Sequence, residues 1–269
     1  MIVIGEKING AIPAVKKAIA ERNKVFIQTL ALKETEDGAD YLDVCAGTDV
    51  GEEWDALKWL IETVQEVTET PLCLDSPNPH ILEAAMSLVK RPGIMNSASG
   101  ERDKCKVIFP LLRDNEWKVI LLTCNDNGIP ADGKSKIEIA GCLIETAEGY
   151  GIDQDRIYVD PLVMSVSTVN SSMLDFIEAV KGIKTQYPDV KITSGLSNIS
   201  YGMPCRKLIN KAFLAMALQA GMDSAIMDPG DREMLGTILA AEVLMGQDKY
   251  CRRYNRAYRA GKIGKKNSK

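Results

Sequence analysis

Residues 37–44 read DGADYLDV, and residues 220–227 read AGMDSAIM. In each stretch a glycine closes a helix-like segment, and a short apolar run follows directly. Glycine suits the left-handed backbone that ends many helices, and short, nearly continuous apolar runs are typical of buried parallel strands. The two stretches therefore predict helix-to-strand junctions in an α/β protein.

The same plan recurs along the chain. Apolar runs rich in β-branched residues predict strands, and amphipathic patterns between them predict helices, most clearly at residues 54–68, 136–150 and 172–187. The predicted strands are residues 2–8, 39–46, 72–76, 94–98, 118–125, 157–161, 191–197 and 224–228.

Helix boundaries carry their own signals. Serine and aspartate side chains accept hydrogen bonds from the first free amides of a helix, and glycine commonly follows its last turn. We expect caps at Ser171–Ser172 and Asp231, and helix-ending glycines at Gly38, Gly151 and Gly221.

Eight strand–helix units without a break in composition predict one closed (β/α)8 barrel over residues 1–248. Such barrels run to about 250 residues as a single domain, which suits a chain of 269 residues. An open doubly wound sheet usually has a G-x-G-x-x-G turn after its first strand. Residues 5–10 read GEKING instead, so we favour the barrel.

The C-terminal residues differ in charge from the rest. Residues 249–269 carry nine Lys or Arg and no acid, whereas residues 1–248 carry 24 basic and 37 acidic residues, a net charge of −13. We interpret the segment as a basic extension in which the last helix frays. A nucleic-acid or membrane role is the alternative, although an acidic body repels phosphate backbones. A nucleic-acid role predicts a steep salt dependence that disappears without residues 249–269.

Other features exclude several classes of protein. Seven cysteines stand singly, which argues against a disulfide framework, and with one histidine, His80, we expect no metal site. No apolar run approaches the roughly 20 residues that cross a bilayer. The first residues, MIVIGEKING, lack the features of a signal peptide. We therefore expect a cytoplasmic protein with no membrane or nucleic-acid partner.

Polar side chains stand where the predicted strands end. Active sites of such barrels form at the C-terminal ends of the strands. Any one of these residues can simply terminate local structure, but together they describe a pocket for a neutral heterocycle rich in donors and acceptors. The residues are Glu6, Asn9, Asp43, Asp75, Asn96, Asn125, Asp160, Ser197, Asn198 and Asp228.

A pterin fits this description, because its 2-amino group and N3–H suit one carboxylate, and asparagine offers both a donor and an acceptor. A phosphate site would need backbone amides, Lys or Arg. A Schiff-base aldolase would need a lysine in the barrel mouth, whereas the sixth predicted strand continues as YVDPL, residues 158–162.

Six segments carry a resemblance to a known family. They are IGEKING (4–10), YLDVCAG (41–47), LCLDSPNP (72–79), GIMNSASGE (93–101), IYVDPLVMSVST (157–168) and TSGLSNISYGMPCR (193–206). The chain resembles the methyltetrahydrofolate:corrinoid methyltransferases. These pterin-binding barrels are related to the folate domain of cobalamin-dependent methionine synthase and to dihydropteroate synthase.

The resemblance implies roles for individual residues. Asp75, Asn96 and Asp160 resemble the residues that hold the pterin ring, and Asn198 resembles the asparagine that reaches N5 of the folate. Gly195 and Ser197 match the same loop. Asn198 and Asp75 are the expected catalytic residues.

The remaining members of the expected binding set are less specific. Arg206 matches an arginine near the mouth and is expected near the folate tail, whereas Tyr201 departs from the glutamine expected after GLSN. Glu6 and Asn9 match the first-strand pattern, and Glu6 fits a buried structural acid equally well. The strand-end carboxylates Asp43 and Asp228 complete the set.

The implied reaction moves a methyl group between N5 of tetrahydrofolate and the cobalt of a corrinoid, with 5-methyltetrahydrofolate as the other folate. N5 must be protonated or strongly polarised before the methyl group leaves, and an amide is no acid at neutral pH. We therefore expect Asn198 to favour protonated N5 through a hydrogen bond, with Asp75 in a wider network. The direction of transfer stays open.

The corrinoid must come from a partner protein or as a free cobamide, because the chain has no D-x-H-x-x-G signature. The resemblance also implies a homodimer. Two alternatives remain: dihydropteroate synthase chemistry, although residues 195–206 lack the Ser-Arg-Lys string of that family, and a non-catalytic pterin-binding protein.

Overall fold

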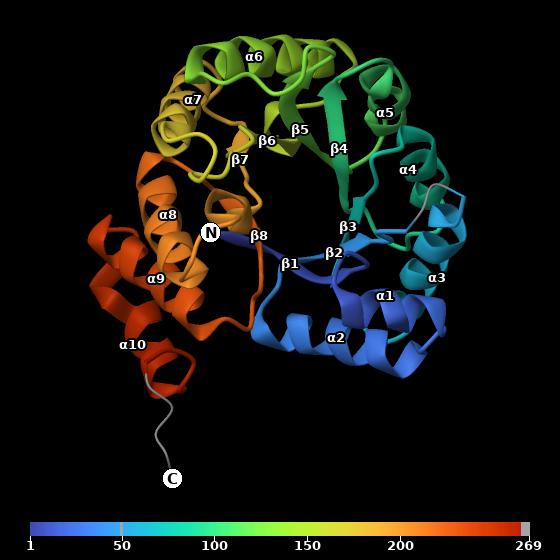
Figure 1. The fold of residues 1–269 in the computed structure, drawn as a ribbon, viewed down its shortest axis with the longest axis horizontal. Helices are drawn as coiled ribbons and strands as arrows, with labels where there is room; N and C mark the ends of the chain where they lie inside the picture. Colours follow the sequence, from blue (N-terminus) through green and yellow to red (C-terminus); the bar gives the residue numbers. More distant parts are fainter. Residues whose placement is uncertain (49–50, 265–269) are drawn as a thin grey trace.

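Eight parallel strands form a ring, and helices surround it (Figure 1). The computed structural model describes residues 1–48 and 51–264. The strand order is β7-β6-β5-β4-β3-β2-β1-β8, which confirms the predicted (β/α)8 barrel. The strands are β1 Ile2–Asn9, β2 Tyr41–Cys45, β3 Leu72–Asp75, β4 Ile94–Gly100, β5 Lys118–Asn125, β6 Ile157–Asp160, β7 Lys191–Ile192 and β8 Ser224–Met227.

The ring closes between β8 and the chain that follows β7. The amide of Asp223 donates to the carbonyl of Ile192 at 3.0 Å, and the amide of Ile226 donates to the carbonyl of Ser194 at 3.0 Å. A single bridge joins Gly195 to Ile226. The predicted strand at 191–197 is therefore wrong in its second half. There the chain turns out of the sheet and forms the short 3-10 helix η2, Leu196–Ser200.

Helices follow the strands around the outside of the ring. The predicted helices at 54–68, 136–150 and 172–187 are confirmed as α3, α6 and α7, within a few residues at each end. The helices are α1 Pro13–Ala20, α2 Lys24–Asp37, α3 Glu53–Gln65, α4 Pro79–Met86, α5 Lys104–Leu112, α6 Gly133–Gly149, α7 Ser172–Gln186, α8 Arg206–Ala220, α9 Arg232–Leu244 and α10 Arg252–Arg259.

The expected helix caps are confirmed at one of two positions. Asp231 accepts from the amides of Glu233 and Met234 at 2.9 and 3.2 Å. The expectation is wrong at α7, because Ser171 makes no side-chain cap. The neighbouring Ser172 instead turns its hydroxyl to the backbone of Met164, donating to the carbonyl at 2.7 Å and accepting from the amide at 2.8 Å. This serine therefore holds the loop before the helix.

The predicted helix-ending glycines are confirmed. Gly38 and Gly221 are C-caps of α2 and α8 with φ of +102° and +120°, and Gly151 follows α6 with φ of +82°. A side chain at such a φ is strained.

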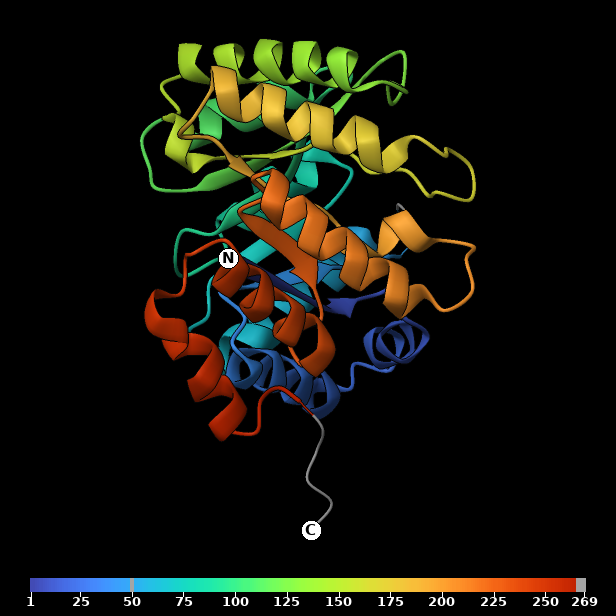
Figure 2. The ribbon, with the colours of Figure 1, turned by 90° about the vertical axis from the view of Figure 1, so that its left-hand side faces the viewer.

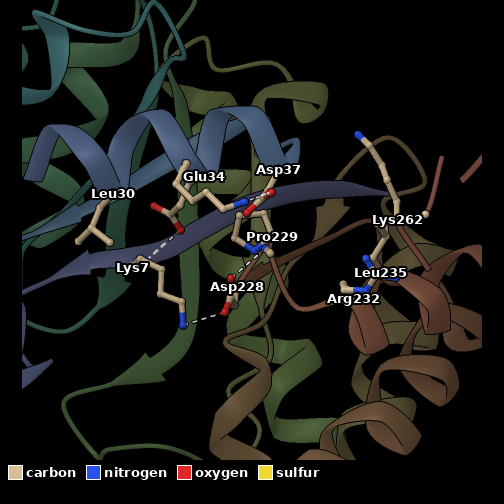
Figure 3. A pocket seen from close by; sticks show the side chains of 12 residues that line it. Lys7, Leu30, Glu34, Asp37, Asp228, Pro229, Arg232, Leu235 and Lys262 are labelled. Atoms are coloured by element: carbon tan, nitrogen blue, oxygen red, sulfur yellow. Dashed lines mark hydrogen bonds and ion pairs between the residues drawn. The ribbon is translucent and has the colours of Figure 1, made fainter. Parts of the chain in front are cut away.

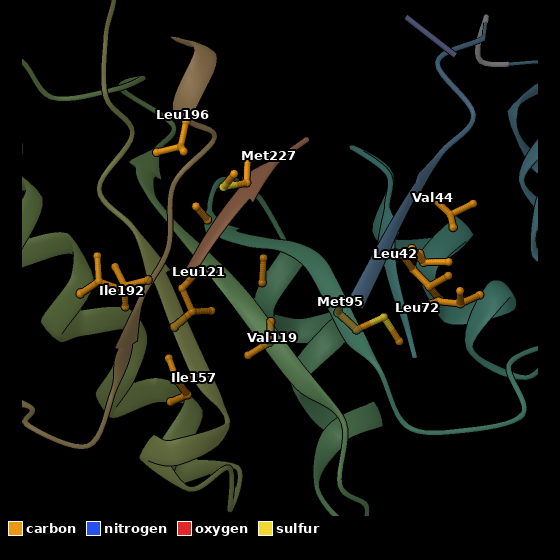
Figure 4. Close-up of a cluster of buried hydrophobic side chains, with 14 of the residues drawn as sticks. Leu42, Val44, Leu72, Met95, Val119, Leu121, Ile157, Ile192, Leu196 and Met227 are labelled. Atoms are coloured by element: carbon orange, nitrogen blue, oxygen red, sulfur yellow. The ribbon is translucent and has the colours of Figure 1, made fainter. Parts of the chain in front are cut away.

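Side chains alternate between two apolar layers. A large cluster lies between the strands and the helices and includes Leu42, Val44 and Val119 (Figure 4). A smaller cluster, Ile4, Cys73, Ile94, Ile120 and Tyr158, fills the inside of the ring. Because successive side chains of a strand face opposite sides, the inward positions that follow Cys73, Ile94 and Tyr158 are the polar residues Asp75, Asn96 and Asp160.

The basic C-terminal segment does not continue α9. The chain turns at Gly246, Tyr250 and Cys251, all with positive φ, and α10 forms a separate helix. Glu242 on α9 binds both Arg253, at 2.7 Å, and the amino group of Met1, at 3.0 Å. The start of α10 therefore lies near Met1, which precedes β1, and away from the strand ends that carry the polar residues (Figure 2).

The expected frayed extension is therefore wrong for residues 252–259, which form α10, and residues 265–269 lie outside the described part. The domain boundary at residue 248 stays a prediction. Within the described residues, no helix has both the length and the apolar character that crossing a membrane requires.

Candidate functional site

Three predicted residues meet at the C-terminal ends of β2, β3 and β4. The strand register pairs Asp75 with Asn96 on one side and with Cys45 on the other. The amide nitrogen of Asn96 donates to Oδ1 of Asp43 at 3.4 Å. Asp43 and Asn96 are buried and Asp75 is half-buried. The structure thus brings Asp43, Asp75 and Asn96 together. Asp43 pairs with Cys73 of the interior cluster, and Asp75 and Asn96 lie at the next inward positions of their strands.

The two carboxyl groups of this cluster share an unfavourable environment. Burial raises the pKa of Asp75 to about 6. Burial, and next the charge of Asp75, hold the pKa of Asp43 well above its usual range. Two carboxylates at one dry site do not ionise together easily. Of the two, Asp43 is therefore the group driven further toward its protonated form, and Asp75 is the one that ionises more readily.

Cys45 and Cys73 line the same cluster, and the sequence reasoning missed them. The thiol of Cys45 hydrogen-bonds to Asp75, and that of Cys73 to Asp43. Burial raises the pKa of both thiols, so they stay neutral and act as weak donors. The spacing of Cys45 could have predicted its position, because it lies two residues after Asp43 and strand alternation turns both side chains inward.

Asp160 ends β6, two strands further around the ring, and its side chain is only 7% exposed. Oδ1 accepts from the amide of Leu162 at 2.8 Å, and the carboxylate also accepts a backbone hydrogen bond from Gly195. Burial raises its pKa to about 6, and the two amides and the charge of Lys136 oppose that rise. At neutral pH, Asp160 is therefore a buried anion held by backbone donors.

The loop after β7 carries Gly195, Ser197 and Asn198. Asn198 lies on η2 and is exposed at the rim, and a Cβ at Gly195 would lie 3.2 Å from its Nδ2. Arg206 donates to the carbonyl of Ser197 at 2.7 Å and to Oγ of Ser200 at 3.1 Å. The observed contacts of Arg206 thus hold this loop, and its expected contact with a folate tail stays a prediction.

Tyr201 follows η2 at the molecular surface. Its side chain is 72% exposed, and the guanidinium of Arg206 lies 6.0 Å from the centre of its ring. The carbonyl of Tyr201 accepts from Oγ of Ser167 at 3.0 Å. The backbone of this residue therefore joins the β7 loop to the β6 loop, while its ring faces solvent.

The ends of β1 and β8 carry the other predicted residues, where Lys7 binds Asp228 at 2.8 Å. Asp228 also accepts from the amide of Gly230 at 2.9 Å, and Asn9 accepts from the amide of Ala11 at 2.9 Å. Asn9 and Asp228 therefore hold their own turns. Burial raises the pKa of Glu6 beside them, with Lys7 opposing.

A cavity of about 540 Å³ lies next to this ion pair, and its lining comes from α2, β1, the β8 loop, α9 and residues 261–262 (Figure 3). Glu34 lies in its wall, 2% exposed, and Oε1 accepts from the amide of Lys7 at 3.0 Å. Burial raises the pKa of Glu34 to about 8. The sequence did not indicate this cavity. Its lining does not include the strand-end residues Asp43, Asp75, Asn96 and Asp160.

Within residues 1–48 and 51–264, no three His, Cys, Asp or Glu side chains are grouped so that they could hold a metal ion. The strand-end cluster offers carboxylate and amide groups for hydrogen bonding instead.

Comparison with solved structures places the fold among the dihydropteroate synthases. The enzyme from Xanthomonas albilineans in complex with 7,8-dihydropteroate superposes with a TM-score of 0.64 at 18% identity, covering 91% of this chain and 92% of that one. The enzyme from Coxiella burnetii gives a TM-score of 0.66 at 15% identity, with 90% and 92% coverage. Identities this low describe the fold alone.

Sequence comparison is more specific. A methylcorrinoid:tetrahydrofolate methyltransferase from Eubacterium limosum is 49% identical over 266 residues, covering 98% of both chains. A methionine synthase from Mycobacterium tuberculosis is 30% identical over 241 residues, which are 84% of this chain and 20% of that protein. The family model of the pterin binding enzymes matches residues 17–228. The chain therefore belongs to the family of pterin-binding enzymes.

Proposed function

We propose that this protein moves a methyl group between N5 of tetrahydrofolate and the cobalt of a corrinoid. The observation that carries the proposal is the 49% identity, over 98% of both chains, to a protein named methylcorrinoid:tetrahydrofolate methyltransferase. The buried carboxylate and amide groups at the barrel mouth support the proposal independently of this sequence similarity.

The pterin ring would bind across the strand ends. Asp160 and Asp75 are acceptors for the 2-amino group and N3–H, and Asn96 offers both a donor and an acceptor. Because burial raises the pKa of Asp43 well above its usual range, Asp75 is the carboxyl group of the pair that ionises more readily. Glu6, Asn9 and Asp228 border the site from β1 and β8, and their contact with substrate is part of the proposal.

The methyl step needs a proton, or strong polarisation, at N5. Asn198 is exposed on η2, and the hydrogen bond from Arg206 to the Ser197 carbonyl holds the loop that carries it. Its amide oxygen would accept a hydrogen bond from protonated N5 and so favour the protonated form. Asp75 would supply charge to that network. The corrinoid supplies the cobalt nucleophile, or carries the methyl group in the other direction, and arrives on a partner protein or as a free cobamide.

Asn198→Ala is the variant that tests this assignment. We expect methyl transfer to slow by about 10- to 100-fold, because a hydrogen bond to a charged group contributes about 1.5–3 kcal/mol. The assay is anaerobic: tetrahydrofolate is mixed with methylcobalamin, or with a methylated corrinoid protein, and cob(I)alamin is followed by its absorbance. Asn255→Ala is the matched control, because Asn255 is exposed on α10, whose first turn lies at the opposite end of the barrel.

Two outcomes contradict the proposal. Absence of turnover with both methyl donors, while calorimetry still detects tetrahydrofolate, would leave a pterin-binding protein without this activity. Equal rates for Asn198→Ala and the control would remove Asn198 from the mechanism. Dihydropteroate synthase chemistry gains no separate support, because the similarity to those enzymes is a similarity of fold.

We further propose that the protein is a cytoplasmic homodimer. Its cysteines are free thiols, as expected in a reducing compartment. An apolar groove of about 380 Å³ runs between α8 and α9, and Leu244 at its edge is 87% exposed. Leu244→Glu is expected to halve the mass measured by sedimentation equilibrium. A monomeric wild-type protein would contradict the dimer.

A further inference from the structure

A lysine is buried beside the pterin-facing end of β6. Lys136 lies in the first turn of α6, and its side chain is 1% exposed. Its Nζ donates to the carbonyl of Leu162 at 3.0 Å, and no carboxylate of the described residues lies within salt-bridge distance of it. Lysine is almost never fully buried unless it is paired. A buried ammonium group bound to a single carbonyl therefore requires an explanation.

Leu162 is the residue that Lys136 holds, and its backbone is strained. Its φ is +54°, in the left-handed region that a leucine seldom adopts. Strain of this kind persists only where surrounding contacts impose it. Two hydrogen bonds do so here: Lys136 donates to the Leu162 carbonyl at 3.0 Å, and the Leu162 amide donates to Oδ1 of Asp160 at 2.8 Å.

The charged groups around Lys136 come from three elements. Asp132 is the N-cap of α6, Asp175 lies on α7, and Asp160 ends β6. On α7, Glu178 packs against Gly133 at the start of α6. Burial lowers the pKa of Lys136, and the three aspartates oppose this change. For Asp160 the ammonium of Lys136 is the cation that favours the ionised form.

We propose that Lys136 is a positioning residue for Asp160: its ammonium group fixes the strained Leu162 peptide, whose amide in turn orients the buried carboxylate toward the pterin. The inference rests on the proposed function only in that Asp160 receives the pterin. Lys136 itself touches no substrate. It acts through one peptide unit and through its charge.

The proposal predicts an effect on the titration of Asp160. The pKa of Asp160 is about 6, so the carboxylate that binds a pterin is present above pH 6 and is lost as the pH falls through that value. A nearby cation typically lowers the pKa of a carboxyl group by about one unit or more. In Lys136→Met the Asp160 midpoint is therefore expected to move up by about one unit, to near pH 7.

Two readouts test this. In the first, carboxyl ¹³C resonances of aspartate-labelled protein are titrated without ligand, and Asp160→Asn assigns the signal. In the second, tetrahydrofolate affinity is measured by calorimetry from pH 5.5 to 8, where the loss of affinity should move up by the same interval. Lys136→Gln keeps a donor for Leu162 without the charge, and should also raise the midpoint. Lys136→Arg keeps the charge, and should restore it.

Lys134→Met is the matched control, because Lys134 is exposed two residues earlier on the same helix. An Asp160 midpoint that is unchanged in both Lys136→Met and Lys136→Gln would overturn the inference. A midpoint that moves in a protein that never binds tetrahydrofolate would instead overturn the proposed function and leave the role of Lys136 intact. Circular dichroism establishes that each variant is folded, and Lys136→Gln carries the test if Lys136→Met is not.

Discussion

Asp160→Asn is expected to weaken tetrahydrofolate binding by about 100-fold at pH 7.5 and, at the same time, to stabilise the free protein. Asp160 is a buried anion at neutral pH, held by the amides of Leu162 and Gly195. A buried, charge-assisted pair that loses its charge typically weakens by about 2–5 kcal/mol, and 2.7 kcal/mol corresponds to about 100-fold. An amide also presents a donor where the pterin presents donors of its own.

The gain in stability follows from the direction of the pKa shift. Burial raises the pKa of Asp160 from 3.8 to about 6 in the folded protein. The stability associated with the protonated form is complete below pH 3.8 and is lost as the pH rises through 6. Above pH 7 the charge costs about 3 kcal/mol, at about 1.4 kcal/mol for each pKa unit. Asparagine removes that cost but keeps only one acceptor oxygen, so we expect a net gain of about 1–2 kcal/mol.

Calorimetry of tetrahydrofolate binding and urea unfolding at pH 5 and pH 7.5 measure both effects. The stability difference from wild type should shrink at pH 5, where the wild-type carboxyl is largely protonated. Asp189→Asn, at an exposed position before β7, should change neither quantity. Wild-type affinity in Asp160→Asn would remove this residue from the pterin site, and lower stability at pH 7.5 would contradict the cost of its burial.

Gly93→Ala is expected to lower the free energy of unfolding by about 3 kcal/mol or more. A Cβ at residue 93 would lie 2.0 Å from the carbonyl oxygen of Leu72 and 3.3 Å from the ring of Trp117. The close neighbour is the backbone carbonyl of Leu72. Residues 72 and 93 cannot move apart without breaking the pairing of Cys73 with Ile94 and the hydrogen bond from the Lys118 amide to the Gly93 carbonyl. Overpacking in a rigid core typically costs about 1–3 kcal/mol, and a contact with backbone lies at the upper end or beyond.

Urea unfolding followed by circular dichroism measures this loss. Gly149→Ala is the control, because no atom lies within 4 Å of a Cβ there and the position is helical. Alanine should stabilise that helix end by up to about 1 kcal/mol. Equal stabilities of the two variants would mean that β3 and β4 separate more readily than their register indicates.

The barrel and the core of the candidate site are determined by local patterns in the sequence. Strand alternation has a period of two residues, so once Leu42, Leu72 and Val159 face the helices, Asp43, Cys73 and Tyr158 must face inward. At the strand ends the same rule turns Asp75, Asn96 and Asp160 into the barrel mouth. These residues could be predicted without the structure, because each depends only on its place along one strand.

Contacts between distant segments are decided only by the tertiary structure. Arg206 binds the loop of Asn198, Lys7 pairs with Asp228, and Lys136 on α6 donates to Leu162 in the loop after β6. The periodicity of apolar residues does not predict such pairs, because each pair joins residues that only the packing of the fold brings together. The position of the basic C-terminal segment is also decided by such a contact. A frayed end was expected, but Glu242, which is buried on α9 beside Met1, binds Arg253 and holds α10 against the barrel. Helix and strand propensities depend on residues that are close in sequence, whereas a buried charge pairs with a residue that the fold places beside it.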